Sequence, residues 1–191
     1  MNKSHRIVTG LALTATGAVA AGLAVSGTAA SAQPTTARPA AAAQHREWPS
    51  SEAANKALVL RFLQDVLNGH HGDHAARYLT DDAQFHAGTV GDITGRDNFA
   101  GLLTTVVTAI PDLDAALQDI RADGDEVVVR VVVTGTQKGD LLGVPASGRH
   151  VRWDAIDLYR IEHGKISQEW AAEDFTAFLN DTGTYKAPWI Q

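Results

Sequence analysis

The sequence predicts an α+β domain, in which N-terminal helices pack on the concave face of a curved, mainly antiparallel sheet to give a cone-shaped barrel. Three observations predict this class. Apolar residues recur at helical spacing before residue 111, alternate with polar residues after it, and the alternating segments are separated by turn residues. A curved sheet with helices across its open side encloses a cavity, so we expect the function to lie in a pocket.

The helices come first along the chain. Spacings of three and four between apolar residues predict a helix from Ser51, with Ser50 or Ser51 as its N-cap, and Asn68-Gly69 ends it. A short second helix is expected over residues 73–79. A third opens at Gly95-Arg96-Asp97 and is stopped by Pro111.

The strands follow, apart from an early one over residues 83–87. Strands are expected over residues 113–121, 126–136, 150–161 and 165–172, with turns or a Gly-containing loop (138–149) between them. The segment 126–136 is almost wholly β-branched, which favours a strand. A short closing helix is expected over residues 175–179, with Asp174 as its N-cap rather than a pocket residue.

The N-terminus has the order of a secretory signal peptide over residues 1–32. Lys3, His5 and Arg6 precede a mildly apolar run, and Ala30 and Ala32 give an A-x-A cleavage signature. A transmembrane anchor is the alternative, but Thr, Ser and Gly dilute the run. We therefore expect a secreted or extracytoplasmic protein, not inserted in a membrane after cleavage. A flexible linker (33–50), the domain (51–183) and a C-terminal tail (184–191) follow.

Charge and composition argue against nucleic-acid binding and exclude stabilisation by disulfides. Residues 1–32 hold two basic and no acidic residues, so the remaining chain has 14 basic and 22 acidic residues, a net charge of −8. Such a chain is not expected to bind nucleic acid, which requires a basic face. The chain also has no cysteine, so the domain depends on packing without disulfides.

Strand alternation selects the residues that would line the pocket. Trp153, Asp157 and Tyr159 share one face of the strand 150–161, and apolar walls with one carboxylate suit a ligand cavity. A buried Asp157 would have a raised pKa suited to acid–base catalysis, although it could instead be a salt-bridged surface carboxylate.

Four further residues complete the predicted site, each with a structural alternative. Glu169 and His86 are expected to assist Asp157, but Glu169 could be solvated and His86 could be a hydrogen-bonded structural residue. Phe85 and Trp170 are expected to contact a ligand together with Trp153 and Tyr159, although tryptophans serve equally as plain core.

No metal or cofactor is expected. The His70-His71-Gly72-Asp73-His74 cluster invites a metal interpretation, but it lies at a helix–helix turn where the two adjacent histidines point apart. The sequence has no G-x-S-x-G motif, phosphate-binding loop or cysteine nucleophile.

Several segments resemble the SnoaL-like polyketide cyclases and ester cyclases of the nuclear-transport-factor-2-like superfamily. They are NKALVLRFLQDVLNGHHGD, GRDNFAGLLTTVVTAIPDL, GDEVVVRVVVTGTQKGDLLGVPASGRHV and IDLYRIEHGKISQEWAAED, and together they span 55–179. The stretch from Thr134 to Arg149 is the most specific. The resemblance implies an α+β cone with an apolar pocket for a small apolar molecule, and a homodimer packed through the sheets.

The resemblance also implies a reaction. Polyketide cyclases close a ring by an intramolecular aldol reaction without a cofactor, using an Asp on the last strand and a His on the preceding one. Counted from Gly164-Lys165-Ile166, the Asp position is Ala171 here and the His position is Asp157. Asp157 would then replace the missing base in a cyclase-like lyase or isomerase. Epoxide hydrolase-like or ketosteroid isomerase-like chemistry, or ligand binding without catalysis, are the alternatives.

Overall fold

The computed structural model describes residues 49–189, so the predicted signal peptide and nearly all of the linker lie outside the described residues. The chain begins with α1 (Pro49–Phe62), which continues directly into a π-helical turn, η1 (Leu63–Asn68), and then a 3₁₀ turn, η2 (Gly72–Arg77). None of the described helices is long and apolar enough to cross a membrane.

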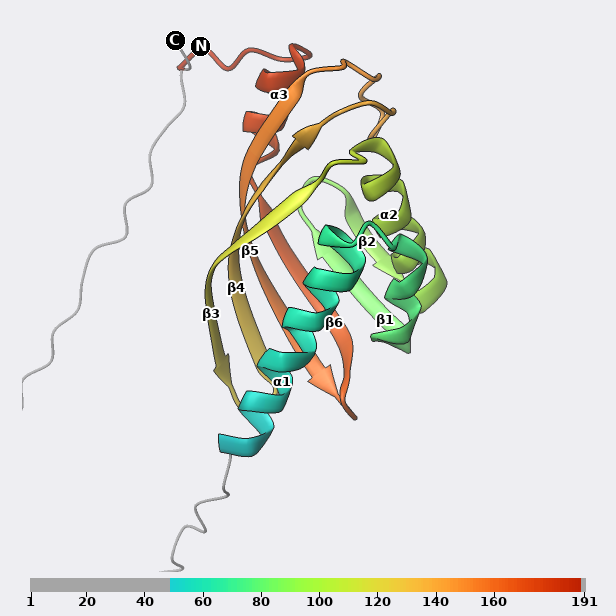
Figure 1. The fold of residues 1–191 in the computed structure, drawn as a ribbon, viewed down its shortest axis with the longest axis vertical. Coiled ribbons are helices and arrows are strands. Elements are labelled where there is room, and N and C mark those ends of the chain that lie inside the picture. Colours follow the sequence, from blue (N-terminus) through green and yellow to red (C-terminus); the bar gives the residue numbers. More distant parts are fainter. Residues whose placement is uncertain (1–48, 190–191) are drawn as a thin grey trace, which may run out of the picture. The chain divides into compact units, whose positions relative to one another are not determined.

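One six-stranded sheet forms the rest of the domain, in the order β2-β1-β6-β5-β4-β3. The strands are β1 (Leu79–Ala87), β2 (Gly91–Thr94), β3 (Asp114–Asp123), β4 (Glu126–Thr136), β5 (His150–Glu162) and β6 (Lys165–Glu173). All neighbours pair antiparallel except β1 and β6, which are parallel. The predicted class, α+β with a mainly antiparallel sheet, is confirmed, although the curved sheet stays unclosed (Figure 1).

The helices cover one face of this sheet. In Figure 1, α1 lies across the sheet and α2 (Arg96–Ala109) lies on the side of β1 and β2. Phe62 and Val66 from the first helical segment and Phe99 from α2 are buried against strand residues such as Val127 and Val129. Because side chains alternate along each strand, the inward half of every strand forms the wall of the enclosed space.

Local details differ from the sequence prediction. The first helix begins at Pro49, so Ser51 lies within the helix and is not its N-cap. β1 starts four residues earlier than predicted, and the four-residue β2 was not predicted; it is mostly exposed and lacks the apolar alternation that marks a strand. The last helix, α3 (Phe175–Thr182), is capped as expected, because the Asp174 side chain accepts a hydrogen bond from the Ala177 N–H.

Gly72 fixes the close approach of the 3₁₀ turn to α2. A Cβ atom at this position would lie 2.7 Å from the backbone nitrogen of Thr104, and the helix backbone cannot move away as a flexible side chain could. Gly101, on the exposed side of the same helix, has nothing within 4 Å of such a Cβ atom.

We expect Gly72→Ala to lower the free energy of unfolding by about 1–3 kcal/mol, because overpacking forces the turn and the helix apart. The matched variant Gly101→Ala should raise it by about 0.5–1 kcal/mol, because alanine favours a helix over glycine. Urea denaturation measures both. Equal effects of the two substitutions would contradict this account of the contact.

Candidate active site

An internal cavity lies between the inner face of the sheet and the helices. The cavity volume accessible to water-sized molecules is about 70 Å³. Its wall is mainly apolar, and the residues that supply most of this apolar surface are Phe62, Leu67, Phe85, Val90, Leu102, Leu103, Val106, Leu141, Leu142, Trp153 and Phe175. Such a lining with few polar groups is typical of small-molecule sites.

Three carboxyl groups and one phenol supply the polar part of the wall. They belong to Asp157 and Tyr159 on β5 and to Glu169 and Glu173 on β6. No Lys, Arg or His lines the cavity in the described part of the chain. The site therefore gathers acidic groups with no basic partner among its walls.

Strand register places the carboxyl groups around one position. In the β5–β6 ladder Asp157 lies directly opposite Ala171, Tyr159 opposite Glu169, and Ala155 opposite Glu173. Glu169 and Glu173 are each two residues from Ala171, so their side chains share its face of the strand. Diagonal neighbours of this kind have Cβ atoms about 7–8 Å apart at most. Ala171, where the sequence comparison expects a catalytic Asp, thus has a carboxylate opposite it and one on either side.

Burial decides the protonation of these groups. Asp157 and Glu169 are each only 5% exposed. Burial first, and then the charge of Glu173, raises the pKa of Asp157 well above its usual range. Burial, followed by the charges of Asp157 and Glu173, does the same to the pKa of Glu169, against a smaller opposing effect of the Tyr159 hydroxyl. Both carboxyls are thereby biased toward the neutral form.

Glu173 differs from the other two carboxyl groups. Burial raises its pKa to about 7, and the nearby indole of Trp153 opposes that rise. A group with this pKa exchanges protons near neutral pH, which is the property required of a general acid or base. Tyr159, by contrast, has its pKa raised well above the usual value by burial and then by the surrounding carboxylates, so its phenol keeps its proton.

Two buried carboxyl oxygens of the cavity have no hydrogen-bond partner among the described residues. They are Oδ1 of Asp157 and Oε2 of Glu169. An unpaired buried polar group costs about 1–3 kcal/mol, so folded proteins normally satisfy such groups with protein, water or ligand. These atoms are therefore the natural contacts for a polar group of a bound molecule.

The structure corrects two of the predicted site residues. His86 and Trp170 do not line the cavity but lie on the opposite face of the sheet. The imidazole Nδ1 of His86 is 2.9 Å from Oδ1 of Asp92, and its ring stacks on Trp170 with centroids 5.3 Å apart. Alternation explains the error: Phe85 and Ala87 on either side of His86 point inward, so His86 must point outward. Asp157, Glu169, Trp153, Tyr159 and Phe85 line the cavity, and their catalytic and ligand-binding roles stay predictions.

Glu173 is the residue that the sequence analysis missed. The last strand was expected to end at Ala172, whereas β6 continues to Glu173. The signal was present in the alternation itself, because Ser167, Glu169, Ala171 and Glu173 follow at steps of two. One more residue of strand would have placed the third carboxyl in the pocket.

The loop 138–149 contributes to the cavity through Leu141 and Leu142. A fully buried side chain, Gln137, holds this loop in place. Its Nε2 donates to the carbonyls of Val144 and Pro145, both at 3.1 Å, and its Oε1 accepts from the backbone N–H (3.2 Å) and the hydroxyl (2.7 Å) of Ser147.

Replacing Gln137 with Met keeps its approximate size but removes these hydrogen bonds. We expect Gln137→Met to lower the free energy of unfolding by about 1–3 kcal/mol, and to speed amide hydrogen exchange at Leu141 and Val144. Hydrogen-exchange mass spectrometry of the loop measures the second effect. The exposed neighbour Lys138→Met is the control, and unchanged exchange in Gln137→Met would contradict the proposed anchoring.

The raised carboxyl pKa values predict an unusual dependence of stability on pH. The folded state keeps these protons where the unfolded chain has released them, so stability falls as pH rises through the interval between the two pKa values. For Glu173 that interval runs from 4.5 to about 7. Glu173→Gln should therefore match the wild type near pH 4.5 and exceed its free energy of unfolding at pH 8 by up to about 3 kcal/mol.

Denaturant unfolding at several pH values tests this, with the exposed Glu162→Gln as the control. If the curves of the wild type and Glu173→Gln run parallel from pH 4.5 to 8, Glu173 is not a buried group with a raised pKa.

Comparison with known proteins agrees with this architecture. Residues 57–182 match the family of SnoaL-like polyketide cyclases. Two aklanonic acid methyl ester cyclases, DnrD of Streptomyces peucetius and DauD of Streptomyces sp. (strain C5), are each 30% identical over 141 residues. The match covers 69% of this chain and 90% and 81% of theirs.

Solved structures share the fold. TsrD from Streptomyces laurentii is 27% identical with a TM-score of 0.62, over 70% of this chain and 97% of its own. A candidate SnoaL-like polyketide cyclase from Jannaschia sp. CCS1 gives a TM-score of 0.65 at 22% identity, over 71% and 95% of the two chains. An LEH-like epoxide hydrolase of M. tuberculosis gives 0.57 at 16% identity, over 70% and 92%. The chain belongs to the SnoaL-like polyketide cyclase family and has its nuclear-transport-factor-2-like fold.

Proposed function

We propose that this protein is an exported enzyme of the ester cyclase/polyketide cyclase type, which performs cofactor-free acid–base chemistry on a small apolar carbonyl compound. The observation that carries the proposal is the group of three carboxyls in the wall of one apolar cavity, of which Asp157 and Glu169 are buried and Glu173 is half-buried. The pKa values of all three carboxyls are raised above the usual range. A site in which one carboxyl is neutral while another is ionised can supply both a general acid and a general base.

The proposed reaction uses an ionised and a neutral carboxyl together. Glu173, whose pKa is about 7, takes the proton from the carbon next to a substrate carbonyl. The resulting enolate carbon attacks a second carbonyl of the same molecule, forming the ring C–C bond as the C=O π pair moves to oxygen. Protonated Asp157, assisted by Glu169, then delivers a proton to that oxygen, and the proton held by Glu173 restores the donor.

This scheme extends the sequence hypothesis, which gave the role of base to Asp157 with Glu169 assisting. Asp157 remains a member of the acid–base group, and Glu173 takes the place of His86, which lies outside the cavity. The Ala171 side chain cannot take part in proton transfer, but the three carboxyls around it can reach the same substrate.

Epoxide opening is a second candidate that the same groups favour. A neutral carboxyl can protonate an epoxide oxygen while an ionised carboxyl activates a water molecule, and the cavity has room for water. The likeness to an epoxide hydrolase concerns the fold alone. Ketosteroid isomerase-like proton transfer would use the same base.

We also propose that the protein acts outside the cytoplasm, because residues 1–32 have the order of a cleavable signal peptide. The outer face of the sheet carries Ile156, which is 52% exposed, and it is the face through which a homodimer would pack.

Deuterium uptake in D₂O tests the chemistry without knowledge of the natural substrate. We expect the wild type to catalyse exchange at the acidic carbon of a diketone or keto ester panel, followed by NMR. Glu173→Gln should lower that rate by at least about 100-fold, and Asp157→Asn should lower product formation by a similar factor, because each removes a proton-transfer group. Glu162→Gln should behave as the wild type.

A ligand-binding assay distinguishes an enzyme from a protein that only binds the ligand. Both cavity variants should still bind an apolar ketone, measured by quenching of tryptophan fluorescence. If the wild type binds such ligands yet neither exchanges nor converts any compound or epoxide of the panel, the protein is a binding protein and the enzymatic proposal is wrong.

A further inference from the structure

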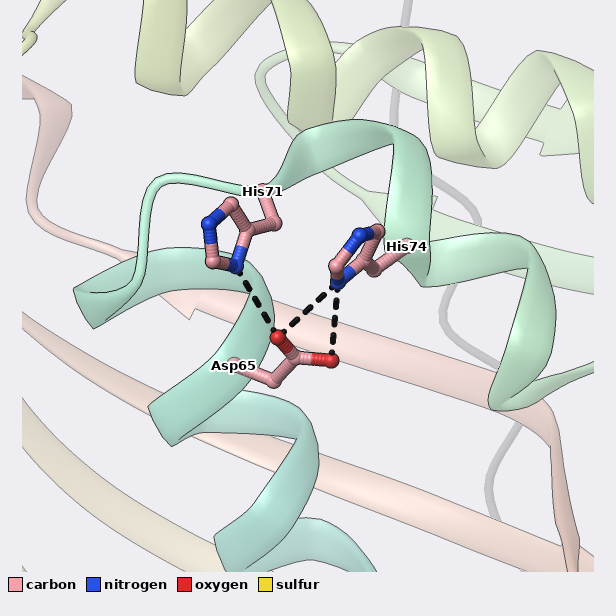
Figure 2. Close-up of side chains that lie close together, drawn as sticks. All are labelled: Asp65, His71 and His74. Carbon is pink, nitrogen blue, oxygen red and sulfur yellow. Dashed lines mark hydrogen bonds and ion pairs between the residues drawn. The ribbon is translucent and has the colours of Figure 1, made fainter.

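A second group of polar side chains lies outside the cavity, where the π-helical turn η1 meets the 3₁₀ turn η2. Figure 2 shows His71 and His74 directed at the carboxylate of Asp65. The Nδ1 atoms of both histidines approach Oδ1 of Asp65, at 3.1 Å and 3.0 Å. None of the three residues lines the cavity, so this group is separate from the proposed active site.

Local backbone geometry builds the group. The chain reverses at His70, which adopts a left-handed conformation (φ 57°) and turns its ring away to the carbonyl of Leu113, 2.8 Å from Nε2. The adjacent histidines therefore do point apart, as the sequence suggests. The 3₁₀ turn then places His74 three residues after His71, and residues at this spacing lie above one another in a 3₁₀ helix. Asp65, six residues before His71, supplies a third potential metal ligand that the histidine cluster alone does not indicate.

The spacing of the donor atoms suits a metal ion. Zn²⁺ binds imidazole nitrogen and carboxylate oxygen at about 2.0–2.2 Å, so neighbouring donors of a tetrahedral site lie about 3.3–3.6 Å apart. The two observed nitrogen–oxygen distances are a few tenths of an ångström shorter than that edge, and one ligand atom of each residue lies within 4.8 Å of the others. Small side-chain rotations would open the centre of the triangle to an ion.

A fourth residue orients the carboxylate. The hydroxyl of Tyr78 donates to Oδ2 of Asp65 at 2.9 Å, while Oδ1 faces both histidines and Oδ2 also lies 3.2 Å from Nδ1 of His74. Such outer hydrogen bonds to a ligating carboxylate are usual in metal sites.

Solvent can reach the group. The side chain of His71 is 54% exposed, against 23% for His74 and 28% for Asp65. An open groove that includes Arg61, Gly69 and Tyr78 adjoins Asp65 and His71. An ion held here would therefore keep a coordination position for water, in addition to the three protein donors.

We propose that Asp65, His71 and His74 form a binding site for a divalent transition-metal ion of the zinc type, through both Nδ1 atoms and the Asp65 carboxylate. Borderline nitrogen donors with one carboxylate favour Zn²⁺, Co²⁺ or Ni²⁺ over Mg²⁺ or Ca²⁺. On binding, each neutral imidazole carries its proton on Nε2 and the ion replaces the two Nδ1–H hydrogen bonds. The alternative is a purely hydrogen-bonded turn, in which Asp65 fastens η2 to η1.

Titration of the full chain, freed of metal with a chelator, distinguishes these states. We expect Co²⁺ to give visible absorption bands of an ordered nitrogen- and oxygen-ligated site, Zn²⁺ to displace it at one ion per chain, and the melting temperature to rise with Zn²⁺ concentration. Mg²⁺ should do neither.

Variants assign the site. His71→Ala and His74→Ala should weaken Co²⁺ and Zn²⁺ binding by at least about 100-fold, and Tyr78→Phe by about 10-fold, the usual range for an outer-shell partner. His163→Asn, at an exposed hairpin turn with positive φ that Asn tolerates, is the control and should bind as the wild type.

The His71→Ala variant is expected to fold even if substitutions at Asp65 or His74 disturb folding, because the His71 side chain is mostly exposed. It therefore provides a test that does not depend on the other two variants. The proposal is overturned if the wild type shows neither the Co²⁺ bands nor a Zn²⁺-dependent melting temperature. It is equally overturned if His71→Ala binds the ions as tightly as His163→Asn.

Discussion

The placement of three carboxyl groups, two buried and one half-buried, in the wall of one apolar cavity is the constraint on which the rest of this site depends. Asp157, Glu169 and Glu173 face the same space, and no basic residue of the described chain lines it. Ionising all three together would place like charges in a poorly hydrated interior without compensation, so protons must be retained. A folded domain that holds protons near neutral pH at the wall of an apolar cavity is suited to moving them to and from a ligand. The same burial costs stability, which the surrounding core must supply.

The sheet provides the geometry that this constraint needs. Asp157 and Glu169 sit on neighbouring long strands whose register is fixed by continuous antiparallel pairing, and β1 joins the other edge of β6 in parallel. Sites on paired strands are held more precisely than sites on loops. Where the pocket does depend on a loop, at 138–149, the fully buried Gln137 replaces regular backbone pairing with side-chain hydrogen bonds. Leu141 and the three carboxyls thus belong to the wall of the same cavity.

Much of this could be predicted from the sequence, because periodicity reports which side of an element is buried. The strand Glu126–Thr136 has the predicted bounds, and alternation correctly placed Trp153, Asp157 and Tyr159 inward. His86 was wrongly assigned to the cavity because it was chosen for its catalytic side chain, although the inward-facing residues on either side of it already placed it on the outer face. Glu173 was missed because the ends of strands are the hardest part of an element to predict. The pairing of β1 with β6 arises from tertiary packing, which no local pattern encodes, and the meeting of Asp65 with His71 and His74 depends on the irregular turn between η1 and η2, which periodicity does not reveal.

The most direct measurement of the central claim is an NMR titration of the side-chain carboxyl carbons in the ¹³C-labelled domain, with Asp157→Asn, Glu169→Gln and Glu173→Gln used for assignment. The account predicts that the carboxyl of Glu173 titrates near 7, and that those of Asp157 and Glu169 titrate well above the usual carboxyl range. If all three cavity carboxyls titrate within the usual carboxyl range, they are solvated, and neither their raised pKa values nor the chemistry built on them exists.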